Sequence, residues 1–214
     1  MRIRIISAAL VATLGLGIAL AVPASGQEQQ QDNAARPAPV KFPGSFYFTP
    51  RPPEYIAMEG KPAPELALTD FIKVEGFTND DLKGKITVVD IWATWCGPCI
   101  AAIPKNNEIA AKYADQGVVV LGVCSSSRGQ ETYAQAVQKH NIQYPTAKDP
   151  ELKTQKAWNV KFYPTYAIVD REGVVRGIGL KPGNLEDAIK MLLKEQPATN
   201  DGGEAQVAGG EAGE

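Results

Sequence analysis

Two short stretches in the middle of the chain consist almost entirely of hydrophobic residues. The first covers residues 85–93 and is rich in valine and isoleucine, and the second covers residues 117–124 and is rich in valine. A strand with one face in water alternates apolar and polar side chains, whereas a strand that is covered on both faces is apolar nearly throughout. Both stretches therefore predict buried strands, and we expect them to be neighbours at the centre of one sheet.

The segment between these two strands has a helical pattern. Residues 98–115 are rich in alanine and isoleucine, and they are followed by Gly117, a residue type that commonly ends helices. The pattern predicts a crossover helix that begins within the sequence Cys96 to Cys99. We expect a kink at Pro104, because proline has no N–H to donate within the helix.

The hydrophobic pattern of the remaining chain predicts shorter elements. They are helices at residues 130–139, 150–158 and 185–195, an extended piece at 142–146, and strands at 165–169 and 174–178. The last two strands are joined by a loop whose Gly173 can adopt the positive φ of a hairpin turn. Short apolar strands that alternate with helical segments predict an α/β domain, in which helices flank a central mixed sheet.

The two ends of the chain lack this pattern. Residues 1–26 have two arginines, an uncharged apolar run at residues 5–22 and then small residues, which predicts a secretory signal peptide or an uncleaved membrane anchor. Residues 27–55 are rich in Gln, Pro and Ala and predict a disordered tether, and residues 197–214, rich in Gly, Ala and Glu, predict a disordered tail. We therefore expect one folded domain at residues 56–196, outside the cytoplasm.

Charge and cysteine content narrow the classes of function. The chain has 22 basic and 24 acidic residues, well interleaved, and a formal net charge of −2. This balance offers no basic surface for nucleic acid or anionic lipid, so the expected partners are proteins or small thiols. Three cysteines are too few, and odd in number, for the disulfide framework of a small secreted fold. Two of them form a Cys-x-x-Cys pair, which leaves Cys124 apart.

Cys96 and Cys99 lie where the first buried strand gives way to the crossover helix. The thiolate is the reactive form of cysteine, and an ordinary cysteine, with a pKa of about 8.5, is mostly protonated at neutral pH. The unpaired N–H groups and the dipole at a helix start stabilise negative charge on Cys96. Cys99 follows one turn later on the same helical face, close enough for a disulfide but more buried. Cys96 is thus the candidate attacking sulfur and Cys99 the candidate resolving sulfur.

Asp90 is a third candidate catalytic residue. It is a carboxylate in an otherwise apolar strand, six residues before Cys96. Burial raises the pKa of a carboxyl group toward neutrality, which would let Asp90 accept the proton of Cys99, through a water, when a mixed disulfide is resolved. The alternative is a solvated Asp at the end of the strand.

The run of residues 88–99, with Trp95 before the cysteine pair and Gly97 and Pro98 within it, resembles the active-site segment of thioredoxins. The resemblance implies the thioredoxin fold, with the pair Cys96 and Cys99 as a redox-active disulfide and with no other cofactor and no metal. It also implies that Trp95, Gly97 and Pro98 contact the substrate.

Thioredoxins have a buried Asp that matches Asp90, usually with a lysine near it on the adjoining strand. Here that strand ends with residues 121–124, Leu-Gly-Val-Cys, without a lysine. The resemblance therefore leaves open which group tunes the pKa of Asp90.

The stretch from residue 160 to residue 165 carries the same resemblance. In thioredoxin-like proteins the matching proline is in the cis form, and its loop faces the disulfide and pairs with the backbone of the substrate. The resemblance thus implies a cis peptide bond before Pro164 and substrate contacts by Tyr163, Pro164 and Thr165. The alternative is an ordinary trans proline in a turn.

The sequence Gly60 to Leu66 resembles the start of exported thioredoxin-like proteins that include the ResA and TlpA types of thiol-disulfide oxidoreductase, which have a redoxin-like (AhpC/TSA-like) domain. Pro164 follows Cys99 by 65 residues, more than in a minimal thioredoxin, and the excess matches a helix–strand insertion at about residues 130–146, before the cis-proline loop. The resemblance covers residues 56–196.

Members of this group reduce disulfides in an oxidising compartment, for example in cytochrome c maturation or in redox homeostasis with antioxidant activity, and a membrane thiol donor recharges them. The resemblance implies a periplasmic or secreted enzyme that acts on proteins with disulfides, and we expect a monomer. Many members have Glu or Pro where this chain has Gly97, and the dipeptide Gly97–Pro98 favours a reducing pair over a DsbA-like oxidant.

Other functions remain open from the sequence. A disulfide-forming oxidant and a thiol peroxidase share the fold, and a metal-binding chaperone would use Cys96 and Cys99 together with Cys124 and His140. The spacing of these residues is poor for a zinc site. Cys124 is expected to be a small apolar filler at the end of a buried strand. His140, the only histidine, is expected to cap a helix or to lie in solvent.

Overall fold

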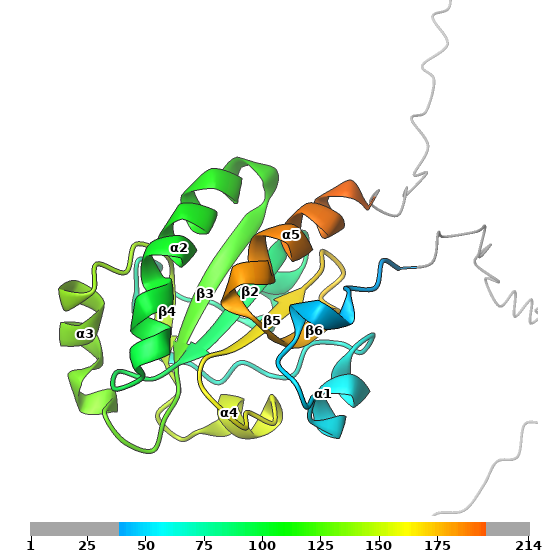
Figure 1. Ribbon diagram of the computed structural model, residues 1–214. Coiled ribbons are helices and arrows are strands. Elements are labelled where there is room, and N and C mark those ends of the chain that lie inside the picture. Colours follow the sequence, from blue (N-terminus) through cyan, green and yellow to red (C-terminus); the bar gives the residue numbers. More distant parts are fainter. Residues whose placement is uncertain (1–38, 196–214) are drawn as a thin grey trace, which may run out of the picture. The chain divides into compact units, whose positions relative to one another are not determined.

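A computed structural model describes residues 39–195, which form one six-stranded mixed sheet with helices on both faces (Figure 1). The strands are β1 (Thr69–Ile72), β2 (Ile86–Trp92), β3 (Val118–Cys124), β4 (Thr146–Lys148), β5 (Thr165–Val169) and β6 (Val175–Leu180). The α-helices are α1 (Pro53–Met58), α2 (Gly97–Tyr113), α3 (Tyr133–Lys139), α4 (Lys153–Ala157) and α5 (Leu185–Lys194). Short 3-10 turns are η1 (Gly44–Phe46), η2 (Asn79–Leu82), η3 (Ala114–Gln116), η4 (Gln130–Thr132) and η5 (Pro182–Asn184).

The strand order is β1-β4-β3-β2-β5-β6, and β2 and β3 are parallel neighbours at its centre. Both central strands and the crossover helix α2 between them confirm the expectation from the hydrophobic pattern. β4 pairs parallel with β3, and β5 and β6 add antiparallel strands on the other side. The predicted helix–strand insertion is present as α3 and β4, which extend the sheet beyond β3.

Several boundaries differ from the expected ones. β4 begins at Thr146, where the predicted extended piece ends, and α4 begins only at Lys153, because Leu152 has a left-handed backbone with a φ of 56°. α2 continues to Tyr113 with Pro104 inside it. β1 has an exposed and half-buried pattern on four residues, so the hydrophobic pattern contained no signal for this edge strand.

The two faces of the sheet have separate hydrophobic cores. Along β2, Val88 and Trp92 pack with side chains of α2, α3 and α5, whereas Val89 and Ile91 pack with α1 and with residues beside α4. Alternate residues of a strand point to opposite faces. Asp90 therefore shares the face of Val88 and Trp92, beneath α2.

The expected tether of residues 27–55 is wrong for the part that the structure describes. Residues 39–55 contain η1 and the start of α1, and they bury the aromatic rings of Phe42, Tyr47 and Tyr55 against the sheet. The folded domain therefore begins well before residue 56.

Two glycines of β6 explain why this segment packs on the sheet. A Cβ atom at Gly177 would lie 2.9 Å from the ring of Phe42, and one at Gly179 would lie 2.8 Å from the ring of Tyr55. Only glycine leaves room for these rings. The segment also covers the free edge of β6, because the Phe48 N–H donates to the Gly179 carbonyl at 3.1 Å.

The predicted signal or anchor at residues 1–26, the first part of the tether and the predicted tail at 197–214 lie outside the described residues. Within residues 39–195, no helix has the length and apolar character that a membrane span needs.

Candidate active site

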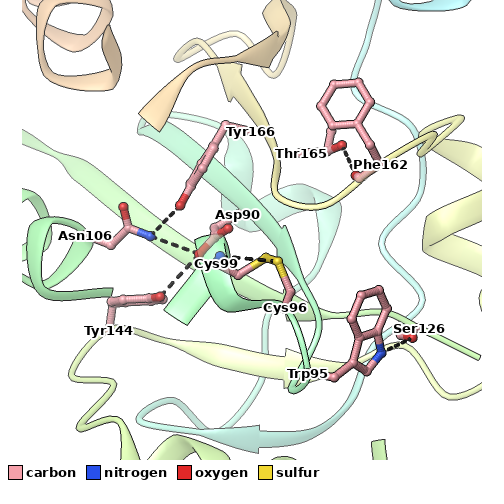
Figure 2. The surroundings of a disulfide bond; sticks show 10 residues. All are labelled: Asp90, Trp95, Cys96, Cys99, Asn106, Ser126, Tyr144, Phe162, Thr165 and Tyr166. Atoms are coloured by element: carbon pink, nitrogen blue, oxygen red, sulfur yellow. Dashed lines mark hydrogen bonds between the residues drawn. A yellow bond between two sulfur atoms is a disulfide. The ribbon is translucent and has the colours of Figure 1, made fainter. Parts of the chain in front are cut away.

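Cys96 and Cys99 form a disulfide at the start of α2, with their Cα atoms 5.2 Å apart (Figure 2). Cys96 is the N-cap residue with an extended backbone, and its Sγ accepts a hydrogen bond of 3.2 Å from the Cys99 N–H. Gly97 and Pro98 are the first two residues of the helix. Proline is well suited to this place because the first N–H groups of a helix have no partner within it. The predicted helix start is confirmed.

Both cysteines are buried in this oxidised form, Cys99 more than Cys96. Cys96 is 4% exposed and Cys99 is 1% exposed. A thiolate on Cys96 would lie at the positive end of α2, where backbone N–H groups and the helix dipole stabilise negative charge. The geometry therefore gives Cys96 the better-stabilised thiolate and the slightly greater exposure.

Trp95 forms an exposed platform beside the disulfide. It is 47% exposed, and its Nε1 donates a hydrogen bond of 3.0 Å to the Ser126 Oγ. The Arg128 guanidinium lies 4.6 Å from the ring centroid, and the Tyr163 ring meets Trp95 edge-on at 5.7 Å. The indole is thus held in place although much of it faces solvent, as expected for a contact surface rather than core packing.

A loop after β3 positions this platform, and the sequence alone did not single it out. The Thr94 hydroxyl donates to the Gly129 carbonyl at 2.8 Å, and Gly129 has a φ of 82°. A Cβ atom at Gly129 would lie 2.4 Å from the Thr94 Oγ1 and 3.1 Å from the Trp95 ring. Glycine is therefore required for the loop to pack against Trp95. The polar run at residues 125–130, directly after a buried strand, is a sequence signal from which such a loop could have been predicted.

The loop before β5 lies against the platform. The peptide bond between Tyr163 and Pro164 is cis, as the resemblance implied. The Tyr163 hydroxyl donates to Gln155 Oε1 at 2.8 Å, and burial raises the pKa of Tyr163 to about 12. The Gln155 N–H donates in turn to the buried Asp149 carboxylate at 2.8 Å. Tyr163 is therefore a neutral, oriented ring between the platform and α4.

The expected substrate contact of Thr165 does not agree with the position of its side chain. Thr165 is fully buried, and its hydroxyl donates to the Phe162 carbonyl at 2.6 Å. The Tyr55 hydroxyl lies 3.3 Å from the Thr165 Oγ1 and also accepts a hydrogen bond from the Lys161 N–H at 3.1 Å. Thr165 therefore holds the cis-proline loop together from within.

Asp90 lies buried under α2, only 1% exposed, which excludes the alternative of a solvated strand end. Its Oδ2 accepts hydrogen bonds from the Asn106 Nδ2 at 2.9 Å and from the Tyr144 hydroxyl at 3.2 Å. Burial raises the pKa of Asp90 to about 7, and hydrogen bonds from Tyr144, Tyr166 and Asn106 oppose that effect. Asn106, Tyr144 and Tyr166 were not expected from the sequence, because no local pattern links them to Asp90.

The other candidate residues lie in ordinary structural places. Cys124 is fully buried, and burial raises the pKa of its thiol to about 12, as fits a small apolar filler. His140 is the C-cap residue of α3, as one of the two expectations had it. Within the described part of the chain, no three His, Cys, Asp or Glu side chains are grouped so that they could hold a metal ion.

Comparisons with known proteins agree with this site. The redoxin family matches residues 58–192. Thiol-disulfide oxidoreductase ResA of Bacillus cereus is 30% identical over 116 residues, which are 54% of this chain and 66%, just under two thirds, of that protein. The ResA protein of Geobacillus kaustophilus is 30% identical over 138 residues, which are 64% of this chain and 78% of that protein.

A solved structure of similar fold is also related in sequence. A Chlorobium tepidum protein named as a thiol:disulfide interchange protein DsbE has 29% identity and a TM-score of 0.56, and the match covers 63% of this chain and 95% of that one. Family, fold and cysteine pair thus agree. The chain belongs to the redoxin family and is a thiol-disulfide oxidoreductase of the ResA/DsbE type, with Cys96 and Cys99 as its cysteine pair on a thioredoxin fold.

Proposed function

We propose that this protein reduces disulfide bonds of other proteins outside the cytoplasm, with Cys96 as the attacking cysteine and Cys99 as the resolving one. The observation that carries the proposal is the disulfide at the start of α2, directly beside the exposed ring of Trp95. At the start of a helix the Cys96 thiolate is stabilised, which makes its sulfur a good leaving group in thiol exchange, whereas structural disulfides resist reduction.

The reaction has two exchange steps. The Cys96 thiolate attacks one sulfur of the substrate disulfide, which forms a mixed disulfide and releases the other substrate sulfur as a thiolate. Cys99 then loses its proton to Asp90 through a water, and its sulfur attacks the Cys96 sulfur. The substrate leaves as its second thiolate, and the Cys96–Cys99 disulfide is restored. Two electrons have passed from the cysteine pair to the substrate, and an external thiol donor must return them.

The substrate contacts follow from the surface around the pair. Trp95 and the half-buried Tyr163 form the ring surface, Gly97 and Pro98 are exposed at the helix start, and the loop with Pro164 lies against this surface. We assign these residues to binding of the substrate chain around its disulfide, through aromatic contact and backbone pairing.

The location and the direction of electron flow rest on the sequence. The apolar segment within residues 1–26 supports export to the periplasm or the medium, and it supports anchoring to the membrane if it is not cleaved. The dipeptide Gly97–Pro98 supports a reducing pair. In an oxidising compartment such a pair needs a membrane thiol donor, and reduction of cysteines for cytochrome c maturation is a role of this kind. We propose a monomer.

Activity is tested with insulin, whose disulfides are reduced by dithiothreitol. The wild-type protein should accelerate this reduction, and the Cys96→Ser variant should lose the acceleration because it lacks the attacking thiolate. Cys124→Ala is the matched control, and it should keep full activity because the Cys124 thiol is fully buried and its pKa is raised to about 12, so it does not act as a nucleophile. Full activity of Cys96→Ser would refute the assignment.

The direction of electron flow is tested by equilibrating the Cys96–Cys99 pair with glutathione. A reducing pair should have a potential closer to the thioredoxin value of about −270 mV than to the DsbA value of about −120 mV. A potential near the DsbA value would contradict the reductase. The Cys99→Ser variant cannot resolve mixed disulfides, so it should trap substrate proteins in the exported fraction of the cell.

A further inference from the structure

The residue that pairs with Asp90 on the neighbouring strand β3 is a glycine. In the parallel pairing of β2 and β3, Asp90 lies opposite Gly122. A Cβ atom at Gly122 would lie 2.6 Å from the Thr146 Oγ1 and 3.0 Å from the Tyr144 ring. Because such distances are shorter than van der Waals contact, any larger residue at this position would displace the tyrosine ring. Gly122 thus leaves the space in which the Tyr144 ring lies and from which its hydroxyl reaches Asp90.

The groups that face Asp90 are neutral and come from three elements. Tyr144, from the loop before β4, and Asn106, from α2, both donate to the Oδ2 atom (Figure 2). Asn106 also donates to the hydroxyl of Tyr166, which lies opposite Asp90 on β5, at 2.9 Å. Cys99 lies seven residues before Asn106, so both are on one face of α2. None of these partners carries a positive charge.

The two carboxylate oxygens of Asp90 differ in their surroundings. Oδ2 accepts both hydrogen bonds, whereas Oδ1 is buried and has no hydrogen-bond partner among residues 39–195. Two donors on one oxygen restrict rotation of the carboxyl group, so the other oxygen keeps a defined direction. Oδ1 is therefore the oxygen with free capacity to accept a proton.

From these contacts we propose that Tyr144 is a positioning residue of the reaction: it enters the gap at Gly122 and holds Asp90 by a neutral hydrogen bond, so that Oδ1 receives the proton of Cys99. The inference rests on the proposed function. During resolution the Cys99 proton passes to Oδ1, the new bond forms between the Cys99 and Cys96 sulfurs, and the electron pair of the broken bond leaves with the substrate sulfur.

This arrangement has a consequence for pH dependence. Only ionised Asp90 can take the proton, so the rate of resolution rises with pH as Asp90 loses its own proton. The Tyr144 hydroxyl donates to the charged carboxylate and therefore favours ionisation. Without that hydroxyl, ionisation becomes harder, and the rate profile moves to higher pH. A hydrogen bond to a charged group is strong enough to move the midpoint by about one pH unit.

The test follows resolution without any physiological substrate. Reduced protein in a Cys124→Ala background is mixed with dithiobis(nitrobenzoate) in a stopped-flow instrument. Attack by Cys96 releases the first thionitrobenzoate, and attack by Cys99 on the mixed disulfide releases the second. In Tyr144→Phe the pH midpoint of the second phase should lie about one unit above that of the wild type. Asp90→Asn should lose this pH dependence.

Tyr133→Phe is the matched control, because Tyr133 is a buried tyrosine of the same core and is not among the hydrogen-bond partners of Asp90. Its midpoint should equal that of the wild type. An unchanged midpoint in Tyr144→Phe would overturn the inference. Absence of a second phase in the wild type would instead contradict the proposed function.

A second measurement is independent of turnover. The carboxyl carbon of Asp90 is followed by NMR in oxidised protein labelled with [13C]aspartate, as a function of pH. Tyr144→Phe should raise the titration midpoint of this carbon, and Tyr133→Phe should not. Equal midpoints in all three proteins would overturn the role of Tyr144 even if the kinetic variant behaved as expected.

Discussion

At the scale of single residues, Asp90 shows how burial and neutral partners together set an acid–base property. Water is excluded from the carboxyl group, which favours its protonated form, and three neutral partners offset only part of this effect. A carboxyl group with a pKa of about 7 is half ionised at neutral pH, so it can both accept and return a proton there.

The same property predicts how stability depends on pH. Because the pKa of Asp90 is higher in the folded than in the unfolded chain, the folded state binds the proton more tightly, and the contribution to stability is lost as pH rises through about 7. Between pH 4 and pH 8 the wild type should lose on the order of 3 kcal/mol of unfolding free energy relative to Asp90→Asn.

Urea unfolding of the oxidised wild type and of oxidised Asp90→Asn at several pH values measures this difference in unfolding free energy. Asp115→Asn, which changes an exposed carboxylate, is the control and should run parallel to the wild type. The assignment of a raised pKa would be wrong if Asp90→Asn kept the same pH slope as the wild type.

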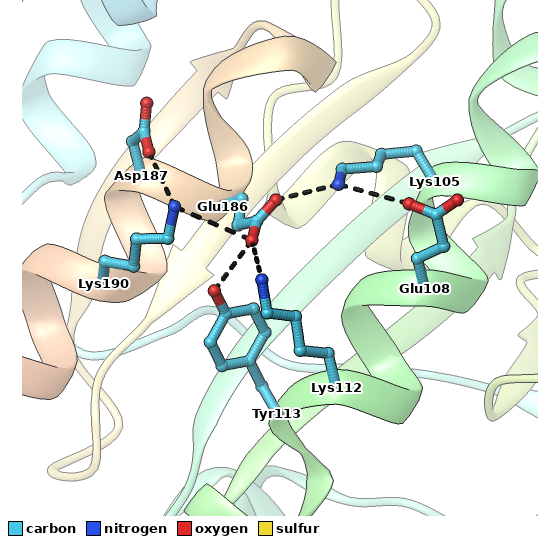
Figure 3. A network of polar contacts seen from close by, with 7 residues as sticks. All are labelled: Lys105, Glu108, Lys112, Tyr113, Glu186, Asp187 and Lys190. Atoms are coloured by element: carbon cyan, nitrogen blue, oxygen red, sulfur yellow. Dashed lines mark hydrogen bonds and ion pairs between the residues drawn. The ribbon is translucent and has the colours of Figure 1, made fainter.

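At the scale of elements, α2 and α5 are joined by an ion cluster around Glu186 (Figure 3). The Glu186 carboxylate pairs with Lys105 at 2.8 Å and Lys112 at 2.7 Å, both from α2, and accepts a hydrogen bond from the Tyr113 hydroxyl at 2.9 Å. Lys190 of α5 lies 3.7 Å away. These partners, Lys105 first, hold the pKa of Glu186 well below its ordinary value.

Glu186→Gln should therefore lower the free energy of unfolding by about 1 kcal/mol at pH 7 and low salt. The pKa shift is opposite in sign to that of Asp90, so this contribution is present above the unfolded pKa and is lost as pH falls below it. Salt at 1 M should reduce the difference because it screens exposed charges. Glu108→Gln, which removes a partner of Lys105 alone, should have a much smaller effect. Equal effects of the two variants on the free energy of unfolding would contradict a stabilising role of the ion cluster around Glu186.

At the scale of the whole molecule, the segment of residues 39–58, which ends with α1, is part of the domain that supports the active site. Tyr55 is fully buried, and its hydroxyl contacts the Lys161 N–H and Thr165 Oγ1 in the loop that contains Pro164. Chain segments more than a hundred residues apart thus meet at this loop. We therefore expect loss of this packing to affect both stability and the position of the loop.

Neighbouring residues provide a direct test. Tyr55→Ala should lower the free energy of unfolding by about 3–5 kcal/mol, because it removes a buried aromatic ring and leaves a cavity. Ile56→Ala changes a side chain that is 55% exposed and should stay within about 0.5 kcal/mol of the wild type. Similar stability of the two variants in chemical denaturation would mean that the segment is not part of the folded domain.

Much of the fold was predictable because its signals are local. β2, β3 and α2 have hydrophobic patterns that extend over many residues, and Cys96 lies at a strand–helix junction that follows from the same patterns. β1 was not predictable, since a four-residue edge strand buries too little for a pattern. The packing of residues 39–55 was missed because it depends on space that the glycines of β6 leave open.

From residue types and spacing, the sequence predicts the cysteine pair, a helix start that stabilises a thiolate and an acid within a buried strand, and the resemblance to thioredoxins adds the cis-proline loop. The groups that surround these residues come from distant parts of the chain and depend on how the chain folds. Asn106 and Tyr144, which bond to Asp90, lie 16 and 54 positions away from it, and Gly122 admits the tyrosine ring only because β3 lies beside β2. Such contacts depend on packing between elements, for which a linear pattern carries no signal.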